Sequence, residues 1–119
     1  MDAPFTNFFF VDIDPKAVAA LRERAESKLA ATTATDVSLW TKHMDCNDAV
    51  DDIVPRIPRG SINLVFVDPT AAQVRFSTIE KLAAVPHTDL LFTFHVSAFR
   101  RAWRSRAREI DAFFPPGAE

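Results

Sequence analysis

The sequence predicts a three-layer α/β fold, in which a mainly parallel sheet of about four strands lies between helices. Apolar runs rich in aromatic and β-branched residues, such as Phe8 to Val11 and Ile62 to Val67, alternate along the chain with helically periodic segments, such as Lys16 to Ala31. Continuous apolar runs are typical of strands with both faces covered, and alternation of strands with helices is typical of parallel sheets.

The first strand and helix have the clearest signals. The strand from Phe8 ends in two acids, Asp12 and Asp14, and Pro15 follows. An aspartate N-cap before a proline is a favoured helix start, because the carboxylate accepts backbone N–H groups and proline fits the first helical position. One face of this helix is apolar and is expected to pack on the sheet. Its residues are Val18, Leu21, Ala25 and Leu29.

Six further elements complete the predicted alternation. The first is a strand, which we expect near a sheet edge, and the second is a short helix that ends at prolines. A strand, a helix, a strand and a last helix follow. Their expected ranges are Val37 to Thr41, Ala49 to Val54, Ser61 to Val67, Phe76 to Val85, Leu90 to Phe94 and Val96 to Phe113. For the helix from Phe76 we expect Ser77 or Gln73 near its start, and an inward face of Phe76, Ile79, Leu82 and Ala83.

The length and composition are typical of an ordinary globular protein, and we expect residues 1–119 to form one domain. Hydrophobic residues make up 48% and charged residues 25% of the 119 residues, with a net charge of −2. This balance gives no general attraction to nucleic acid or to an anionic membrane. The apolar runs are shorter than the roughly 20 residues of a membrane span, and no basic leader opens the chain. We therefore expect a cytoplasmic protein without a membrane partner.

Neither cysteine nor histidine indicates a metal site. Cys46 is the only cysteine, which excludes an internal disulfide and a multi-cysteine metal site. His43, His87 and His95 lack the spacing of metal ligands, so we interpret them as structural or exposed. Cys46 is interpreted as a small buried hydrophobe in preference to a nucleophile, because no nearby cation would lower its pKa.

Acids follow three of the predicted strands. Asp12 and Asp68 each come directly after an apolar run, and Asp45 follows the second strand. Ligands of open α/β sheets bind at the carboxyl ends of strands, and a carboxylate there suits a ribose diol. Each acid also has a purely local interpretation. Asp12 could bond loop amides, Asp14 is more naturally a cap than a ligand, Asp45 could cap the next helix with Asp48 as partner, and Asp68 could serve a turn.

Three landmarks together resemble the three-Cys-motif partner protein family, which is similar to Rossmann-type S-adenosylmethionine methyltransferases. They are Phe8 to Pro15, then Met44 to Asp48, then Leu64 to Pro69 followed by Thr78 to Glu80 and Asp89 to Leu91. The resemblance covers about residues 8–114. It implies S-adenosylmethionine as cofactor, with Asp12 on the ribose, Asp45 at the adenine amino group and Cys46 beside the adenine. It also implies that Asp68 and Pro69 line the reaction side of the pocket.

The chain departs from this family in two ways. Its only glycines are Gly60 and Gly117, so it contains neither a G-x-G-x-x-G turn nor a P-loop. The first strand of a complete methyltransferase domain and its glycine-rich loop are missing, which predicts a truncated domain that is either a fragment or a shortened form. Thr70 and Ala71 also replace the aromatic residue and glycine that the family tends to have after Asp68-Pro69.

Three functions remain open at the level of sequence. The first is an incomplete methyltransferase-like domain, which would be an enzyme only if another segment restores the missing strand. The second is a non-catalytic module that binds a protein partner, which the scarcity of glycine favours. The third is association with nucleic acid through an arginine-rich last helix, because guanidinium groups on one face suit phosphate contacts. Its candidate residues are Arg100, Arg101, Arg104 and Arg108.

Overall fold

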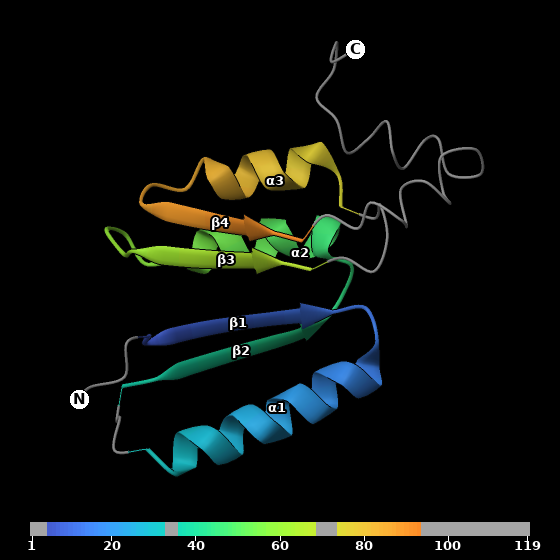
Figure 1. The fold of residues 1–119 in the computed structure, drawn as a ribbon, viewed down its shortest axis with the longest axis vertical. Helices are drawn as coiled ribbons and strands as arrows, with labels where there is room; N and C mark the ends of the chain where they lie inside the picture. Colours follow the sequence, from blue (N-terminus) through green and yellow to red (C-terminus); the bar gives the residue numbers. More distant parts are fainter. Residues whose placement is uncertain (1–4, 33–35, 69–73, 94–119) are drawn as a thin grey trace. The chain divides into compact units, whose positions relative to one another are not determined.

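A computed structural model describes residues 5–32, 36–68 and 74–93 of the chain. These residues form helices and short parallel strands, which confirms the α/β class (Figure 1). The chain divides into two compact units, Met1–Ala49 and Val50–Glu119. Each unit contains its own pair of parallel strands, and the two are described in turn.

The first unit is a strand, a helix and a second strand. Strands β1 (Asn7–Asp12) and β2 (Ser38–His43) pair in parallel, with Phe9 opposite Trp40. The rings of Phe9 and Trp40 lie 6.0 Å apart between centroids. Helix α1 (Pro15–Ala30) connects the strands and packs against both (Figure 1). The predicted strand–helix unit is therefore confirmed, and the second strand extends to His43 instead of ending at Thr41.

Helix α1 begins as the sequence predicts. Asp14 is the N-cap, its Oδ1 accepts the N–H of Lys16 at 2.9 Å, and Pro15 is the first helical residue. Such a cap stabilises a helix by about 1 kcal/mol. The four residues predicted to face the sheet are all half-buried, and the charged residues between them are exposed. They are Val18, Leu21, Ala25 and Leu29.

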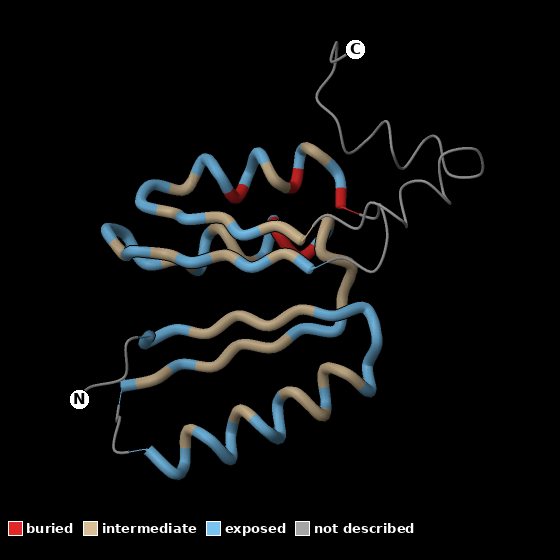
Figure 2. Tube along the Cα trace, viewed as in Figure 1, coloured by how far each residue is buried: buried red, intermediate tan, exposed pale blue. Residues whose placement is uncertain are grey.

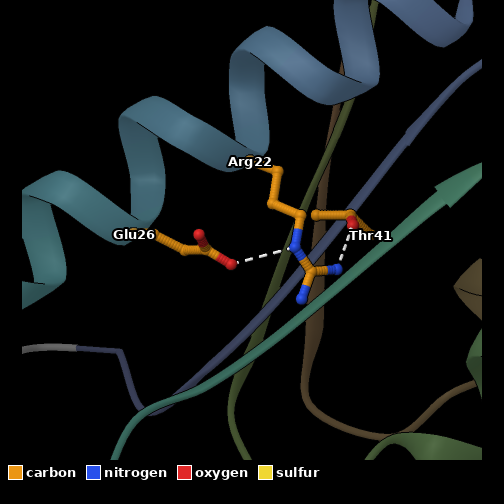
Figure 3. A network of polar contacts seen from close by, with 3 residues as sticks. All are labelled: Arg22, Glu26 and Thr41. Carbon is orange, nitrogen blue, oxygen red and sulfur yellow. Dashed lines mark hydrogen bonds and ion pairs between the residues drawn. The ribbon is translucent and has the colours of Figure 1, made fainter.

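One polar network also joins α1 to β2. Arg22 donates from Nε to Glu26 Oε1 at 2.9 Å and from Nη1 to Thr41 Oγ1 at 3.0 Å (Figure 3). Both members of the ion pair are more than half exposed, so the pair itself contributes only about 0.2–1 kcal/mol. The two donors of the guanidinium thus link the exposed side of α1 to β2.

The second unit holds the other parallel pair. Helix α2 (Cys46–Ile53) leads into it and is followed by a 3-10 turn, Val54–Arg56. Strands β3 (Asn63–Val67) and β4 (Thr88–Phe92) are joined through α3 (Phe76–Ala83), which packs against β4 (Figure 1). The sequence predicts this helix from Ala49 to Val54. In the structure it begins three residues earlier, at Cys46, and ends one residue earlier, at Ile53.

Four hydrophobic residues and one threonine are buried in the described part of the chain (Figure 2). In α3 the predicted inward face is only partly correct, because Leu82 is buried while Ala83 is exposed. Thr78, which the prediction did not include, is 4% exposed. Arg75 is the N-cap residue of α3 and makes no side-chain cap, and Ser77 lies near the start of the helix as predicted, whereas Gln73 lies outside the described residues. The buried hydrophobic residues are Ala49, Val50, Val74 and Leu82.

The predicted single sheet of four strands is not what the described residues form. Their hydrogen bonds give two sheets of two strands, β1 with β2 and β3 with β4. The expectation that both faces of the apolar strands are covered is also wrong for β3, where Leu64 and Phe66 are 51% and 65% exposed. The predicted last helix, Val96 to Phe113, lies outside the described residues. In the described part of the chain, no helix combines the length and apolar character needed to cross a membrane.

Candidate functional site

Two of the predicted site residues meet at the carboxyl end of the β1–β2 pair. Asp12 is the last residue of β1 and lies opposite His43, the last residue of β2. The N–H of Met44 donates to the Asp12 carbonyl at 3.0 Å, which extends the ladder by one bond and places Asp45 next to this contact. The parallel register therefore brings Asp12 and Asp45 to one edge, as the sequence predicts for acids that follow neighbouring strands.

Each carboxylate at this edge also shapes its own loop. Asp12 Oδ1 accepts the N–H of Asp14 at 2.8 Å, and Asp45 Oδ1 accepts the N–H of Asn47 at 2.8 Å. The Asp45 carbonyl accepts the N–H of Ala49 at 2.9 Å, so Asp45 acts as the N-cap of α2. These bonds confirm that Asp12 accepts from a loop amide and that Asp14 and Asp45 cap helices, while the role of Asp48 as partner of the Asp45 cap stays a prediction. These bonds are compatible with ligand binding, because an ionised carboxylate offers about four acceptor sites and each backbone bond uses one.

The two acids differ in exposure. Asp12 is exposed, whereas Asp45 is half-buried. An exposed acceptor can reach a diol that approaches from solvent, and a partly buried one suits the recognition of an amino group held closer to the protein. The three residues at this edge that the sequence predicts as ligand-binding, Asp12, Asp45 and Cys46, offer two carboxylate acceptors and a thiol. The edge therefore suits neutral hydroxyl and amino donors more than phosphates, which are recognised by cations and N–H groups.

Cys46 is the first residue of α2 and is half-buried beside this edge. Burial raises the pKa of its thiol, and the neighbouring Asp45 carboxylate raises it further. The thiol is therefore mainly protonated at neutral pH, which favours the interpretation of Cys46 as a small hydrophobe over that of a nucleophile, although its side chain is half-buried and not fully buried. The protonated thiol presents a polarizable sulfur without negative charge at this edge.

We expect iodoacetamide to alkylate Cys46 in the folded chain more slowly than it alkylates the urea-unfolded chain at pH 8. Because the thiolate is the reactive form, a raised pKa lowers the rate at any pH below it. Asp45→Asn keeps a capping side chain but removes the charge, so it should increase the folded-state rate modestly, since burial is the larger cause of the shift. Asp52→Asn, at an exposed position of the same helix, should leave the rate unchanged. Folded-state alkylation as fast as in urea would contradict this prediction.

The remaining predicted site residues belong to the second unit or lie outside the described residues. Asp68 follows β3 in the second unit and is exposed. Pro69 and the four arginines Arg100, Arg101, Arg104 and Arg108 lie outside the described residues. His43 and His87 are exposed, and His87 adopts a left-handed conformation, with φ of 57°, in the turn before β4. Within residues 5–32, 36–68 and 74–93, no three His, Cys, Asp or Glu side chains lie close enough together to hold a metal ion.

Sequence reasoning missed the backbone contribution at this edge. The Met44 N–H that joins β2 to the end of β1 has no side-chain signal, and it is this bond that places Asp45 against the Asp12 loop.

Comparison with protein-family models, curated proteins and solved structures finds no match to this chain.

Proposed function

We propose that the chain is an S-adenosylmethionine-dependent methyltransferase-like domain of the three-Cys-motif partner type, whose nucleoside half-site is the carboxyl edge of β1–β2. The observation that carries the proposal is the meeting of Asp12 and Asp45 at this edge, joined by the Met44 N–H to Asp12 carbonyl bond. Ligands of α/β sheets bind outside the carboxyl ends of the strands, and an acid at this position is the usual acceptor for ribose hydroxyls.

The donor set fits the nucleoside part of the cofactor. In the proposal, the exposed Asp12 accepts the two ribose hydroxyls and the half-buried Asp45 accepts the adenine amino group. The protonated Cys46 lies beside the adenine ring as an uncharged neighbour. Asp68 and Pro69 would line the reaction side, where methyl transfer depends mainly on holding a nucleophile in line with the activated methyl group.

The strand pairing supports a Rossmann-type sheet as the finer description of the fold. In the doubly wound order 3-2-1-4-5-6, strand 2 pairs with strand 3 and strand 4 pairs with strand 5. Pairing of β1 with β2 and of β3 with β4 is what this order gives when its first strand is not among the described strands. In the proposal, methyl transfer requires a further segment that supplies that strand and its glycine-rich loop.

The half-site is tested by calorimetric titration of the purified chain with S-adenosylhomocysteine, together with thermal melts. We expect saturable binding and a rise in melting temperature, because a ligand that binds only the folded state stabilises it. Asp12→Asn can still accept the Asp14 N–H but loses its charge, so it should weaken binding by about tenfold or more, which is about 1.4 kcal/mol. Asp52→Asn, an exposed carboxylate change away from the edge, should bind as the natural chain does.

The proposal fails if the folded chain, verified by circular dichroism, shows neither heat of binding nor a shift in melting temperature. Equal weakening by Asp12→Asn and Asp52→Asn would also count against it, because a general charge effect would then explain the loss.

A second candidate function is a non-catalytic module that binds a protein partner. The specific observation in its favour is the second unit, where large apolar side chains of the β3–β4 sheet are exposed. Exposed apolar patches of this kind on a folded domain mark interaction surfaces.

A further inference from the structure

An exposed turn lies in the second unit between the 3-10 segment and β3. Pro58, Arg59 and Gly60 are all exposed. The N–H of Ser61 donates to the Pro58 carbonyl at 3.2 Å, and Gly60 has φ of 75°. This bond and this φ angle are those of a type II turn, with Arg59 second and Gly60 third. In the described chain, no atom apart from its chain neighbours lies within 4 Å of where a Cβ on Gly60 would project. The backbone at Gly60 is therefore open to solvent.

The turn has the sequence Pro-Arg-Gly-Ser, residues 58–61. Serine proteases with an acidic specificity pocket select a basic residue before the bond that they hydrolyse. Every other lysine or arginine that the structure describes lies in a helix, a strand or the Val54–Arg56 segment, or is the N-cap residue of α3. Peptide bonds in such elements become accessible only when part of the element unfolds. Among the described basic residues, Arg59 therefore precedes the bond that is most easily reached.

Two contacts to the Pro58 carbonyl hold the turn closed. One is the backbone bond from Ser61, and the other comes from the Ser61 hydroxyl, whose oxygen lies 2.8 Å from the Pro58 carbonyl oxygen. The same hydroxyl also lies 2.7 Å from Asn63 Oδ1. A hydroxyl has one proton to donate, so it serves one of these acceptors at a time. An exposed turn that is closed in this way can open locally while β3 and β4 stay paired.

We propose that this turn is a proteolytic processing site, at which an arginine-specific serine protease hydrolyses the Arg59–Gly60 peptide bond. The Arg59 guanidinium enters the acidic pocket of the protease, and Pro58 occupies the adjoining apolar subsite. Water is the second reactant. The C–N bond breaks, the Arg59 carbonyl carbon gains a C–O bond and becomes a carboxylate, and both protons of the water end on the new amino group of Gly60.

Cleavage at this bond divides the chain between α2 and β3. Residues 1–59 keep the two strands of the β1–β2 edge, and residues 60–119 keep β3, α3 and β4. Lys81 of α3 contacts Asp51 of α2 at 2.8 Å, and this contact would join the two fragments without a covalent bond. A protease would in this way uncouple the β1–β2 edge from the β3–β4 pair. The inference goes beyond the proposed function and does not depend on nucleoside binding.

The test is digestion of the full chain with thrombin, followed by intact-mass spectrometry. Thrombin is an arginine-specific serine protease that accepts proline before the arginine, and proline precedes arginine in this sequence only at Arg56 and Arg59. We expect one early cut, which gives residues 1–59 and 60–119. Arg59→Gln should slow this cut about a hundredfold or more, because it leaves the acidic pocket unpaired. Arg24→Gln, at an exposed position of α1, should leave the rate unchanged.

A peptide of residues 54–63 separates opening of the turn from recognition by the protease. Where opening is fast, the rate of cleavage follows the population of the open form. Ser61→Ala removes the hydroxyl contact, so it should raise the rate in the folded chain about two- to tenfold and change the rate in the peptide little. Local opening exposes little surface, so urea below the unfolding transition should hardly change the rate.

Three results would overturn the proposal. The first is a folded chain that stays intact under conditions that cleave the peptide. The second is an early cut at any bond other than Arg59–Gly60. The third is a rate that rises with urea in step with unfolding, because cleavage would then require the whole unit to unfold. Titration with S-adenosylhomocysteine does not involve this turn, so failure here leaves the nucleoside proposal standing, and the reverse also holds.

Discussion

Val50→Asp is expected to lower the free energy of unfolding by about 4 kcal/mol or more, the range of substitutions that bury an unpaired charge. Val50 is 2% exposed and is the largest fully buried side chain in the described part of the chain. A carboxylate at this position loses its hydration, and the side chains of a hydrophobic core offer no compensating hydrogen bond. Urea denaturation followed by far-UV circular dichroism measures the loss.

The pH dependence of the destabilisation by Val50→Asp identifies burial of the new carboxyl group as its cause. Burial raises the pKa of a carboxyl group in the folded state above its unfolded value of about 3.9. The folded variant then binds more protons than the unfolded one between these two values, so its stability falls as pH rises through this window. The deficit relative to the natural chain should be smaller at pH 4 than at pH 7. Ser77→Asp, an exposed carboxylate on α3, should change stability by less than about 0.5 kcal/mol at either pH.

A midpoint for Val50→Asp that equals that of the natural chain would show that this face of α2 is accessible to solvent. A deficit that is the same at both pH values would indicate lost packing instead of a buried charge.

Elements with strong local signals could be predicted from the sequence. Asp14 and Pro15 specify the start of α1 through a side-chain cap and a fixed φ angle, and both depend only on neighbouring residues. The start of α2 was predicted three residues too late, because Cys46, Asn47 and Asp48 have weak helix propensity. The Asp45 cap overrides that propensity by accepting the Asn47 and Ala49 N–H groups.

Sheet connectivity and burial could not be predicted in the same way. An apolar run such as Leu64 to Val67 has the same composition whether one face or two faces are covered, so its exposure depends on distant segments. The hydrogen bonds that pair β1 with β2 and β3 with β4 likewise join residues far apart in the sequence. No local pattern predicts which strands become neighbours.

The candidate site was predicted in part for the same physical reason. Asp12 and Asp45 could be placed at one edge, because parallel strands present their carboxyl ends together. Their second function as backbone acceptors could be proposed but not decided, since a carboxylate that caps a helix and one that binds a ligand have the same sequence signal. The raised pKa of Cys46 depends mainly on burial, which the sequence does not specify.

Leu82→Ala is expected to lower the free energy of unfolding by about 2–5 kcal/mol, as buried leucines do when a cavity replaces the side chain. Leu82 is 8% exposed and lies in α3, which packs against β4. Its neighbour Lys81 provides a matched truncation on the same helix. Lys81 Nζ contacts Asp51 Oδ1 at 2.8 Å, but both side chains are about half exposed or more, so the bridge is accessible to water and salt.

Lys81→Ala should therefore cost only about 0.2–1 kcal/mol, and this cost should shrink further in high salt because screening weakens an exposed ion pair. The cost of Leu82→Ala should be insensitive to salt, since it comes from lost apolar contacts and not from charge. Urea midpoints of both variants at low and high salt distinguish the two contributions. If Lys81→Ala proved the more destabilising change, α3 would be held by its ion pair to α2 and not by the apolar side chain beneath it.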